Sequence, residues 1–154
     1  METAKNMVSD KHHEIVSVPV GTKVIIALEK MNQKKVGAIL VTRDEKIIGI
    51  WTERDLMRNI LKEDFDLNNA LIDDYMTTKL VTAPHTDTVY NLMDKFLGLR
   101  LRHLLIEEDG QIVGIVSGGD VMRCVIHSKD KELRQLNSMV SWDYYEDWRW
   151  VPKK

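Results

Sequence analysis

The sequence is poor in the features that mark several large classes of protein. Its 154 residues include one cysteine, which excludes an internal disulfide and a cysteine-rich metal site and fits a reducing compartment. Only three prolines and eight glycines are present, and 44% of the residues are hydrophobic, so we expect neither a fibrous nor a disordered chain. Since no run approaches 18 apolar residues, no membrane-spanning helix is expected.

Excess charge of one sign is also absent. The formal net charge is −2, and no run of five basic residues occurs anywhere in the chain. Nucleic acids and anionic membranes attract proteins through clustered lysine and arginine, so we expect neither as a partner. The first ten residues lack the apolar core of a secretory signal, which favours a cytoplasmic protein.

What the chain does contain is an internal repeat. Residues 16–61 align with residues 81–126 at a constant offset of 65 residues, without a gap. Twelve of the 46 aligned positions are identical, far more than chance would give, so the chain contains one unit twice. In the first copy the identical residues are Val16, Pro19, Val24, Lys30, Leu40, Asp44, Ile47, Gly49, Ile50, Asp55, Met57 and Arg58.

Each copy begins with a predicted strand and a predicted helix. The strand, residues 15–18 or residues 80–83, runs into a proline that ends it. Apolar residues one helical turn apart then predict an amphipathic helix. We expect Thr22 to cap this helix in the first copy, and Asp87 or Thr86 to cap it in the second.

The rest of each copy is a predicted hairpin with a closing helix, which completes a β-α-β-β-α unit of the α/β (α+β) class. The second hairpin turn contains Asp109-Gly110, a typical hairpin signal. The closing helices start after Thr52 and Ser117. The hairpin strands are residues 37–41, 47–51, 103–106 and 112–116.

A unit of about 50 residues has too little core to fold alone, so we expect the two copies to pack sheet to sheet with pseudo-two-fold symmetry. Such packing creates two related clefts. The predicted divisions are an N-terminal leader (1–13), the first repeat (14–63), a linker (64–78), the second repeat (79–128) and a C-terminal helix with an aromatic tail (129–154).

Four short motifs resemble those of the CBS domain family. Residues 49–56 and 114–121 are similar to its signature of glycine, two apolar residues, serine or threonine, and aspartate three residues later. Residues 74–77 resemble the Asp-apolar-Met-Thr motif that precedes a second repeat, and residues 102–106 resemble the Arg-His strand. The likeness is greatest to stand-alone bacterial CBS pairs. The stretch before the first copy, Ser9-Asp10-Lys11-His12, lacks the Asp-apolar-Met-Thr pattern.

The resemblance implies a regulatory module that binds an adenine nucleotide between its repeats. A carboxylate is a good acceptor for the two hydroxyls of a ribose, and Asp55 and Asp120 suit that role, with Thr52 and Ser117 beside them. The same spacing also fits a helix N-cap, and the two roles are compatible. The implied ligand-binding residues are Ser117, Asp120, Gly118, Gly119, Arg102, His103, Thr82, Thr52, Asp55, Arg54 and Val16.

The two copies differ in the residues that could hold a phosphate. By the resemblance, Arg102 and His103 supply phosphate contacts, whereas their counterparts Gly37 and Ala38 cannot. Gly118 and Gly119 would let a phosphate approach the start of the closing helix, although a simple turn explains them equally well. In the first copy, Arg54 and Arg58 are the possible substitutes. We therefore expect the cleft that uses Ser117, Asp120 and His103 to bind the nucleotide better.

The sequence has none of the common catalytic motifs, so we expect no enzyme, no metal and no obligatory cofactor. The expected ligand is AMP, ADP, ATP or NAD, and the expected assembly is a homodimer. Five of the ten aromatic residues lie in the acidic tail, residues 141–152, which predicts packing on the protein itself or on a client protein. The alternative function is therefore an interaction scaffold with an empty cleft.

Overall fold

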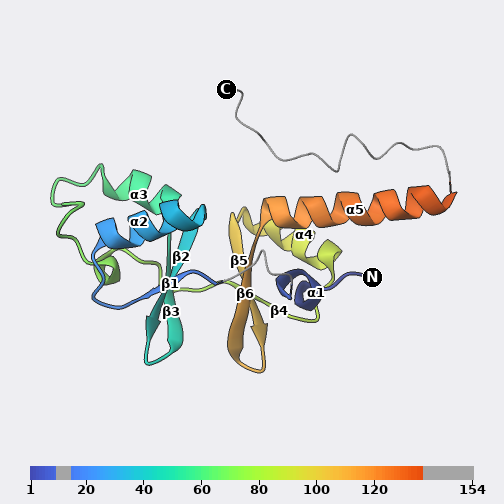
Figure 1. Cartoon of the computed structure of the whole chain (residues 1–154), viewed down its shortest axis with the longest axis horizontal. Coiled ribbons are helices and arrows are strands. Elements are labelled where there is room, and N and C mark those ends of the chain that lie inside the picture. The colour runs from blue at the N-terminus through green and yellow to red at the C-terminus, as the bar shows by residue number, and fades with distance from the viewer. Residues whose placement is uncertain (10–14, 137–154) are drawn as a thin grey trace.

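A computed structural model describes residues 1–9 and 15–136 of the protein, with the backbone alone for residues 134–136. It contains two β-α-β-β-α units, preceded by the short helix α1 (Ala4–Val8), with a 3-10 helix η2 (Ile72–Asp74) between the units (Figure 1). The α+β class and the doubled unit are confirmed. The first unit consists of β1 (Ser17–Pro19), α2 (Val24–Lys34), β2 (Ala38–Arg43), β3 (Lys46–Thr52) and α3 (Glu53–Asn59), and the second of β4 (Thr82–Pro84), α4 (Val89–Leu99), β5 (His103–Glu108), β6 (Gln111–Ser117) and α5 (Gly118–Leu136).

Each unit contains a three-stranded sheet with the same topology. The first strand pairs in parallel with the second, which pairs antiparallel with the third. Ala38 lies opposite Thr52 in the first sheet, and His103 lies opposite Ser117 in the second. These residues correspond at the offset of 65, so residues that match in the sequence also occupy equivalent positions in the two sheets.

The hairpin turns show the same equivalence. Asp44 and Glu45 have φ of 50° and 63°, and Asp109 and Gly110 have φ of 51° and 78°. Positive φ at both central residues is the geometry of a tight type I′ hairpin. The Asp109-Gly110 turn was predicted, whereas the first repeat forms this turn without a glycine.

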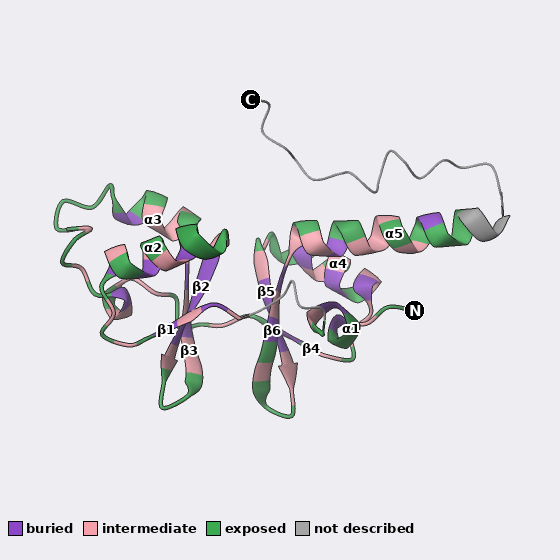
Figure 2. Cartoon of the chain, viewed as in Figure 1, coloured by how far each residue is buried: buried purple, intermediate pink, exposed green. Residues whose placement is uncertain are grey.

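Each unit has its own core between its sheet and its helices. The amphipathic pattern of α2 is confirmed, because Val24 and Met31 are buried and Leu28 packs against them. Figure 2 shows that the buried residues of both units lie along the sheets and on the helix faces turned toward them. The buried core residues are Val16, Val18, Val24, Ala27, Met31, Ile39, Val41, Trp51 and Ile72 in the first unit, and Ala4, Met7, Ala83, Val89, Leu92, Phe96, Leu104, Ile106, Val116 and Val121 in the second.

In each sheet, the face turned away from the helices packs against the corresponding face of the other sheet. Side chains alternate along a strand, so Leu40 points away from the helix-side core that contains Ile39 and Val41. Leu40 is nevertheless only 1% exposed, and its counterpart Leu105 is only 2% exposed. Figure 1 shows the two sheets next to each other, with the helices on the outside. The predicted sheet-to-sheet packing is therefore confirmed.

The segment that precedes each repeat packs on the other repeat. Ala70 O, just before η2, accepts a hydrogen bond of 2.8 Å from Val24 N at the start of α2. Glu2 O, just before α1, accepts one of 3.0 Å from Val89 N at the start of α4. Helix α1 thus covers the second repeat and η2 covers the first, as pseudo-two-fold symmetry requires.

A glycine in the third strand of each sheet makes room for the segment that comes from before the other repeat. A Cβ added to Gly49 would overlap the side chain of Met76, and one added to Gly114 would overlap the side chain of Val8. Only a residue without a side chain lets these segments approach the strand so closely. The two glycines of the repeated signature are therefore docking points for the exchanged segments.

The position of Val8 shows which residues before the first repeat correspond to residues 74–77. Since Val8 occupies the place of Met76, the counterpart of residues 74–77 is Asn6-Met7-Val8-Ser9, three residues earlier than the stretch compared in the sequence. Residues 10–14 lie outside the described residues. The N-terminal residues contribute Met7 to the core of the second repeat and are more than a polar leader.

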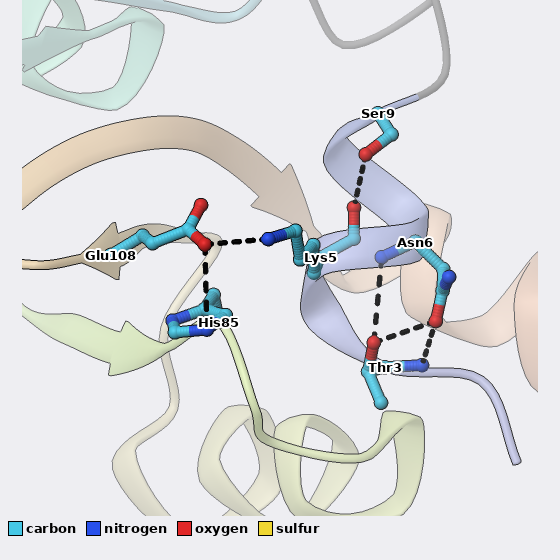
Figure 3. A network of polar contacts seen from close by, with 6 residues as sticks. All are labelled: Thr3, Lys5, Asn6, Ser9, His85 and Glu108. Atoms are coloured by element: carbon cyan, nitrogen blue, oxygen red, sulfur yellow. Dashed lines mark hydrogen bonds and ion pairs between the residues drawn. The ribbon is translucent and has the colours of Figure 1, made fainter.

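Polar contacts also attach α1 to the second repeat (Figure 3). Lys5 Nζ donates a hydrogen bond of 2.6 Å to Glu108 Oε1, and His85 Nε2 lies 3.5 Å from the same oxygen. This pair raises the pKa of Lys5 and lowers the pKa of Glu108. Thr3 and Asn6 form a capping box at the start of α1.

The N-terminal caps of α2 and α4 differ from the predicted ones. Helix α2 has no side-chain cap bond, and Thr22 Oγ1 instead donates to Pro19 O at 2.6 Å. Helix α4 is capped by Thr88, one residue after Asp87, through a 3.2 Å bond from Asn91 N. Helix α5 continues past residue 128, the predicted end of the repeat. The predicted aromatic tail lies outside the described residues.

Candidate ligand-binding cleft

A cleft of about 250 Å³ lies where the two repeats meet. Its walls are mostly apolar, with a hydroxyl, a carboxylate, an imidazole and an ammonium group among them. Both repeats contribute to it, as expected for a site that depends on their packing. The lining residues are Val16, Lys35, Val36, Gly37, Ala38 and Leu40 from the first repeat, and His103, Ile115, Val116, Ser117 and Asp120 from the second.

Ser117 and Asp120 hold each other at the junction of β6 and α5. One Asp120 oxygen accepts hydrogen bonds from Ser117 N at 2.7 Å and from Ser117 Oγ at 2.8 Å, while Asp120 N donates to Ser117 Oγ at 3.2 Å. The other Asp120 oxygen pairs with Arg123. These bonds fix the orientation of the carboxylate at the cleft.

Thr52 and Asp55 form the same arrangement at the junction of β3 and α3. Asp55 accepts from Thr52 N at 2.9 Å and from Thr52 Oγ1 at 3.1 Å, and Asp55 N donates to Thr52 Oγ1 at 3.2 Å. The capping interpretation of this spacing is therefore realised in both repeats. Neither Thr52 nor Asp55 lines the cleft described above.

His103 lines the cleft beside Ser117, its direct neighbour across the β5–β6 ladder. Its Nδ1 is buried and has no hydrogen-bond partner among the described residues. Burial lowers the pKa of the imidazole, and Arg102 lowers it further, whereas Glu53 and Asp120 act in the opposite direction. His103 is therefore neutral at pH 7.

Lys35 is a basic residue of the cleft that sequence reasoning missed. It ends α2 in the left-handed conformation, with φ of 56°, and Arg100 ends α4 in the same way, with φ of 52°. The signal was available, because both residues are basic and correspond at the offset of 65. Close by, a Cβ on Gly37 would lie 3.2 Å from the carboxyl carbon of Glu53, so the glycine makes room for that acidic residue.

The structure brings together four of the eleven predicted site residues, namely Val16, His103, Ser117 and Asp120. Gly118 and Gly119 begin α5 directly behind them. Arg102 is exposed and does not line this cleft, although its neighbour His103 does. Gly37, the counterpart of Arg102, lines the cleft that contains Ser117 and Asp120. The repeat symmetry therefore assigns Arg102 to the equivalent position beside Thr52 and Asp55. The other predicted residues, none of which lines the cleft, are Thr52, Asp55, Arg54 and Thr82.

Other kinds of site find no support within the described ranges. No three His, Cys, Asp or Glu residues in these ranges are grouped so that they could hold a metal ion. Burial, with Glu2 nearby, raises the pKa of the Cys124 thiol to about 11, so it is protonated at neutral pH and a poor nucleophile. None of the helices in this part of the chain is both long and apolar enough to cross a membrane.

Known proteins resemble this chain over both repeats. The mitochondrial CBS domain-containing protein CBSX3 of Arabidopsis thaliana is 33% identical over 123 residues, which are 77% of this chain and 60% of that protein. The chain thus spans less than two thirds of that relative. The crystal structure of a CBS-domain-containing protein from Agrobacterium tumefaciens is 30% identical, has a TM-score of 0.73, and is aligned over 80% of this chain and 98% of its own.

More distant solved structures share the fold. One is CBSX2 in complex with AMP, with 21% identity, a TM-score of 0.67 and coverage of 84% of this chain and 99% of its own. Another is the CBS domain pair of MJ0100 in complex with 5′-methylthioadenosine and S-adenosyl-L-methionine, with 17% identity, a TM-score of 0.71 and coverage of 83% and 98%. The CBS domain family itself matches residues 8–62 and 72–127. This chain therefore belongs to the CBS domain family and contains two copies of the domain.

Proposed function

We propose that this chain is a non-catalytic regulatory module that binds an adenine nucleotide, either AMP, ADP, ATP or NAD, in the cleft between its repeats. The observation that carries the proposal is a cleft that both repeats line, with a fixed carboxylate beside apolar walls. This combination suits a ligand with a flat apolar base joined to a polar sugar.

In the proposed complex, the base lies against the apolar wall that includes Val16, Leu40 and Ile115. The ribose hydroxyls donate hydrogen bonds to Asp120, and Ser117 lies beside them. The phosphate approaches the start of α5, where Gly118 and Gly119 have no side chain to exclude it. The AMP complex of CBSX2 supports an adenosine-type ligand, because that protein shares the fold.

A ligand in this cleft contacts both repeats, so it favours the arrangement of the repeats that it binds best. This preference is the proposed signal. We include a homodimer in the proposal, because large exposed apolar side chains lie on α3 (Met57), just after it (Leu61) and on α5 (Met122). We propose a cytoplasmic location on the sequence features alone.

A thermal-shift screen with AMP, ATP, NAD and S-adenosylmethionine tests the proposal. A nucleotide at a hundred times its Kd stabilises the native state by about 2.7 kcal/mol, which raises the Tm by roughly 5–10 °C for a chain of this size. Asp120→Asn is the control, since it keeps the shape of the side chain and removes its charge. No stabilisation of the wild-type protein at millimolar nucleotide would contradict the proposal and favour the scaffold. Turnover of a bound nucleotide would show an enzyme.

A further inference from the structure

The most unusual polar group of the cleft is the His103 imidazole. Its Nδ1 is buried without a hydrogen-bond partner in the described part of the chain, whereas the great majority of buried polar atoms in proteins have one. The same side chain lines the cleft. A ligand that enters the cleft therefore lies against an imidazole whose Nδ1 makes no hydrogen bond to the described residues.

His103 also lies where a phosphate would enter. It pairs with Ser117 across the β5–β6 ladder, and α5 begins at the next residue, Gly118. The start of this 19-residue helix attracts anions, because its first amide groups lack partners within the helix. A phosphate held there would stand beside the imidazole.

Several charged groups from different elements act on His103 or line its cleft. Glu53 at the start of α3 and Asp120 on α5 favour its protonated form, whereas Arg102 in the preceding chain disfavours it. Lys35, at the end of α2, lines the same cleft. Burial outweighs the two carboxylates, and the pKa of the free imidazole is below its usual value.

A phosphate changes this balance. It adds negative charge next to the imidazole, which favours the protonated form, and a protonated imidazole donates from both ring nitrogens. We propose that His103 takes up one proton when a 5′-phosphorylated adenosine enters the cleft, so that the module binds such ligands more tightly as the pH falls. The inference rests on the proposed function of this cleft, and it makes His103 the residue that distinguishes phosphorylated adenosine from adenosine.

The direction of the effect follows from proton linkage. If binding raises the pKa of His103 from below its usual value to above the pH of the measurement, the complex holds up to one more proton than the free protein. The affinity then rises by at most about tenfold for each pH unit lost, and by roughly three- to tenfold between pH 8 and pH 6.5. The phosphate of AMP itself titrates near pH 6, so a variant must be compared at each pH.

Titration calorimetry of AMP and adenosine is the first test. Binding is measured at pH 6.5, 7.0 and 8.0, in buffers of different ionisation enthalpy, for the wild type, His103→Gln and the control His85→Gln. His85 contacts Glu108 near α1 and does not line the cleft. We expect the wild type and His85→Gln to take up a proton with AMP, His103→Gln to take up markedly less, and adenosine to bind without uptake.

An NMR titration of His103 in the wild-type protein gives a second readout that needs no variant. The pKa of His103 is expected to rise on saturation with AMP and to change little with adenosine. Equal proton uptake by the wild type and His103→Gln, or an unchanged pKa in the AMP complex, overturns the role of His103 and leaves the proposed function standing. Failure of AMP to bind the wild type at any of these pH values overturns both.

Discussion

The two repeats share one fold and differ in the side chains that they bring to the cleft. Both capping boxes have hydrogen bonds of nearly equal length, and Lys35 and Arg100 end equivalent helices with nearly equal φ. Yet where the second repeat has His103, the first has Ala38. The shared turns, caps and glycines therefore maintain the doubled fold. The properties of the cleft depend instead on a few side chains that differ between the repeats.

The largest difference in the two cores is Trp51, whose counterpart is Val116. Trp51 is fully buried, and its Nε1 donates to Asn59 Oδ1 at 2.9 Å. We expect Trp51→Val to lower the free energy of unfolding by about 3–5 kcal/mol, because it leaves a cavity and an unpaired amide oxygen. Urea denaturation measures this, with Val116→Ala as the smaller change in the other repeat. Equal losses in the two variants would contradict the account.

Asp120→Ala against Asp55→Ala separates the ligand role from the capping role. Both aspartates cap a helix with the same bonds, so each variant is expected to lose about 1 kcal/mol of stability. Only Asp120 lines the described cleft. Calorimetry with AMP is therefore expected to show a loss of about 10- to 100-fold in affinity for Asp120→Ala, and a small change for Asp55→Ala. The reverse order would refute the asymmetry.

Gly114→Ala against Gly49→Ala compares the two docked segments. The new methyl group on Gly114 meets the branched side chain of Val8, which has little freedom to turn away. On Gly49 it meets Met76, whose flexible side chain adapts more easily. We expect Gly114→Ala to destabilise the protein by about 1–3 kcal/mol and Gly49→Ala by less. Hydrogen exchange in α1 would show its release, and full protection of α1 in Gly114→Ala would argue against the contact.

The smallest expected effect on stability concerns the N-terminal caps of α2 and α4. Thr88 caps α4 through Asn91 N, whereas Lys23 at the same position before α2 makes no side-chain cap bond. Thr88→Ala is expected to lower stability by about 1 kcal/mol, and Lys23→Ala by only a few tenths. Thermal denaturation of both variants tests this contrast. It fails if the two substitutions shift the Tm equally.

The sequence predicted the fold well because the repeat duplicates every local signal. The constant offset identified the equivalent strands, and Ser117 and Asp120 were placed at one junction by their spacing alone. The caps were predicted less well, because Thr22, Asp87 and Thr88 are all suitable cap residues and tertiary contacts decide among them.

The contacts of α1 were missed because they depend on distant parts of the chain. The segment before the first repeat corresponds to residues 70–77 at an offset of 68 residues, so a comparison at 65 residues cannot align it. The separation of Arg102 from His103 was missed for a similar reason. His103 lines the described cleft and the adjacent Arg102 does not, and only the packing of the repeats shows this difference.

The most direct test of the central claim is a crystal structure of the protein grown with a saturating concentration of AMP. The account predicts density for AMP in the cleft lined by Ser117, Asp120 and His103, with the ribose hydroxyls within hydrogen-bond distance of the Asp120 carboxylate. Density for AMP beside Thr52 and Asp55 alone, or an empty cleft in a protein that binds AMP in solution, would contradict it.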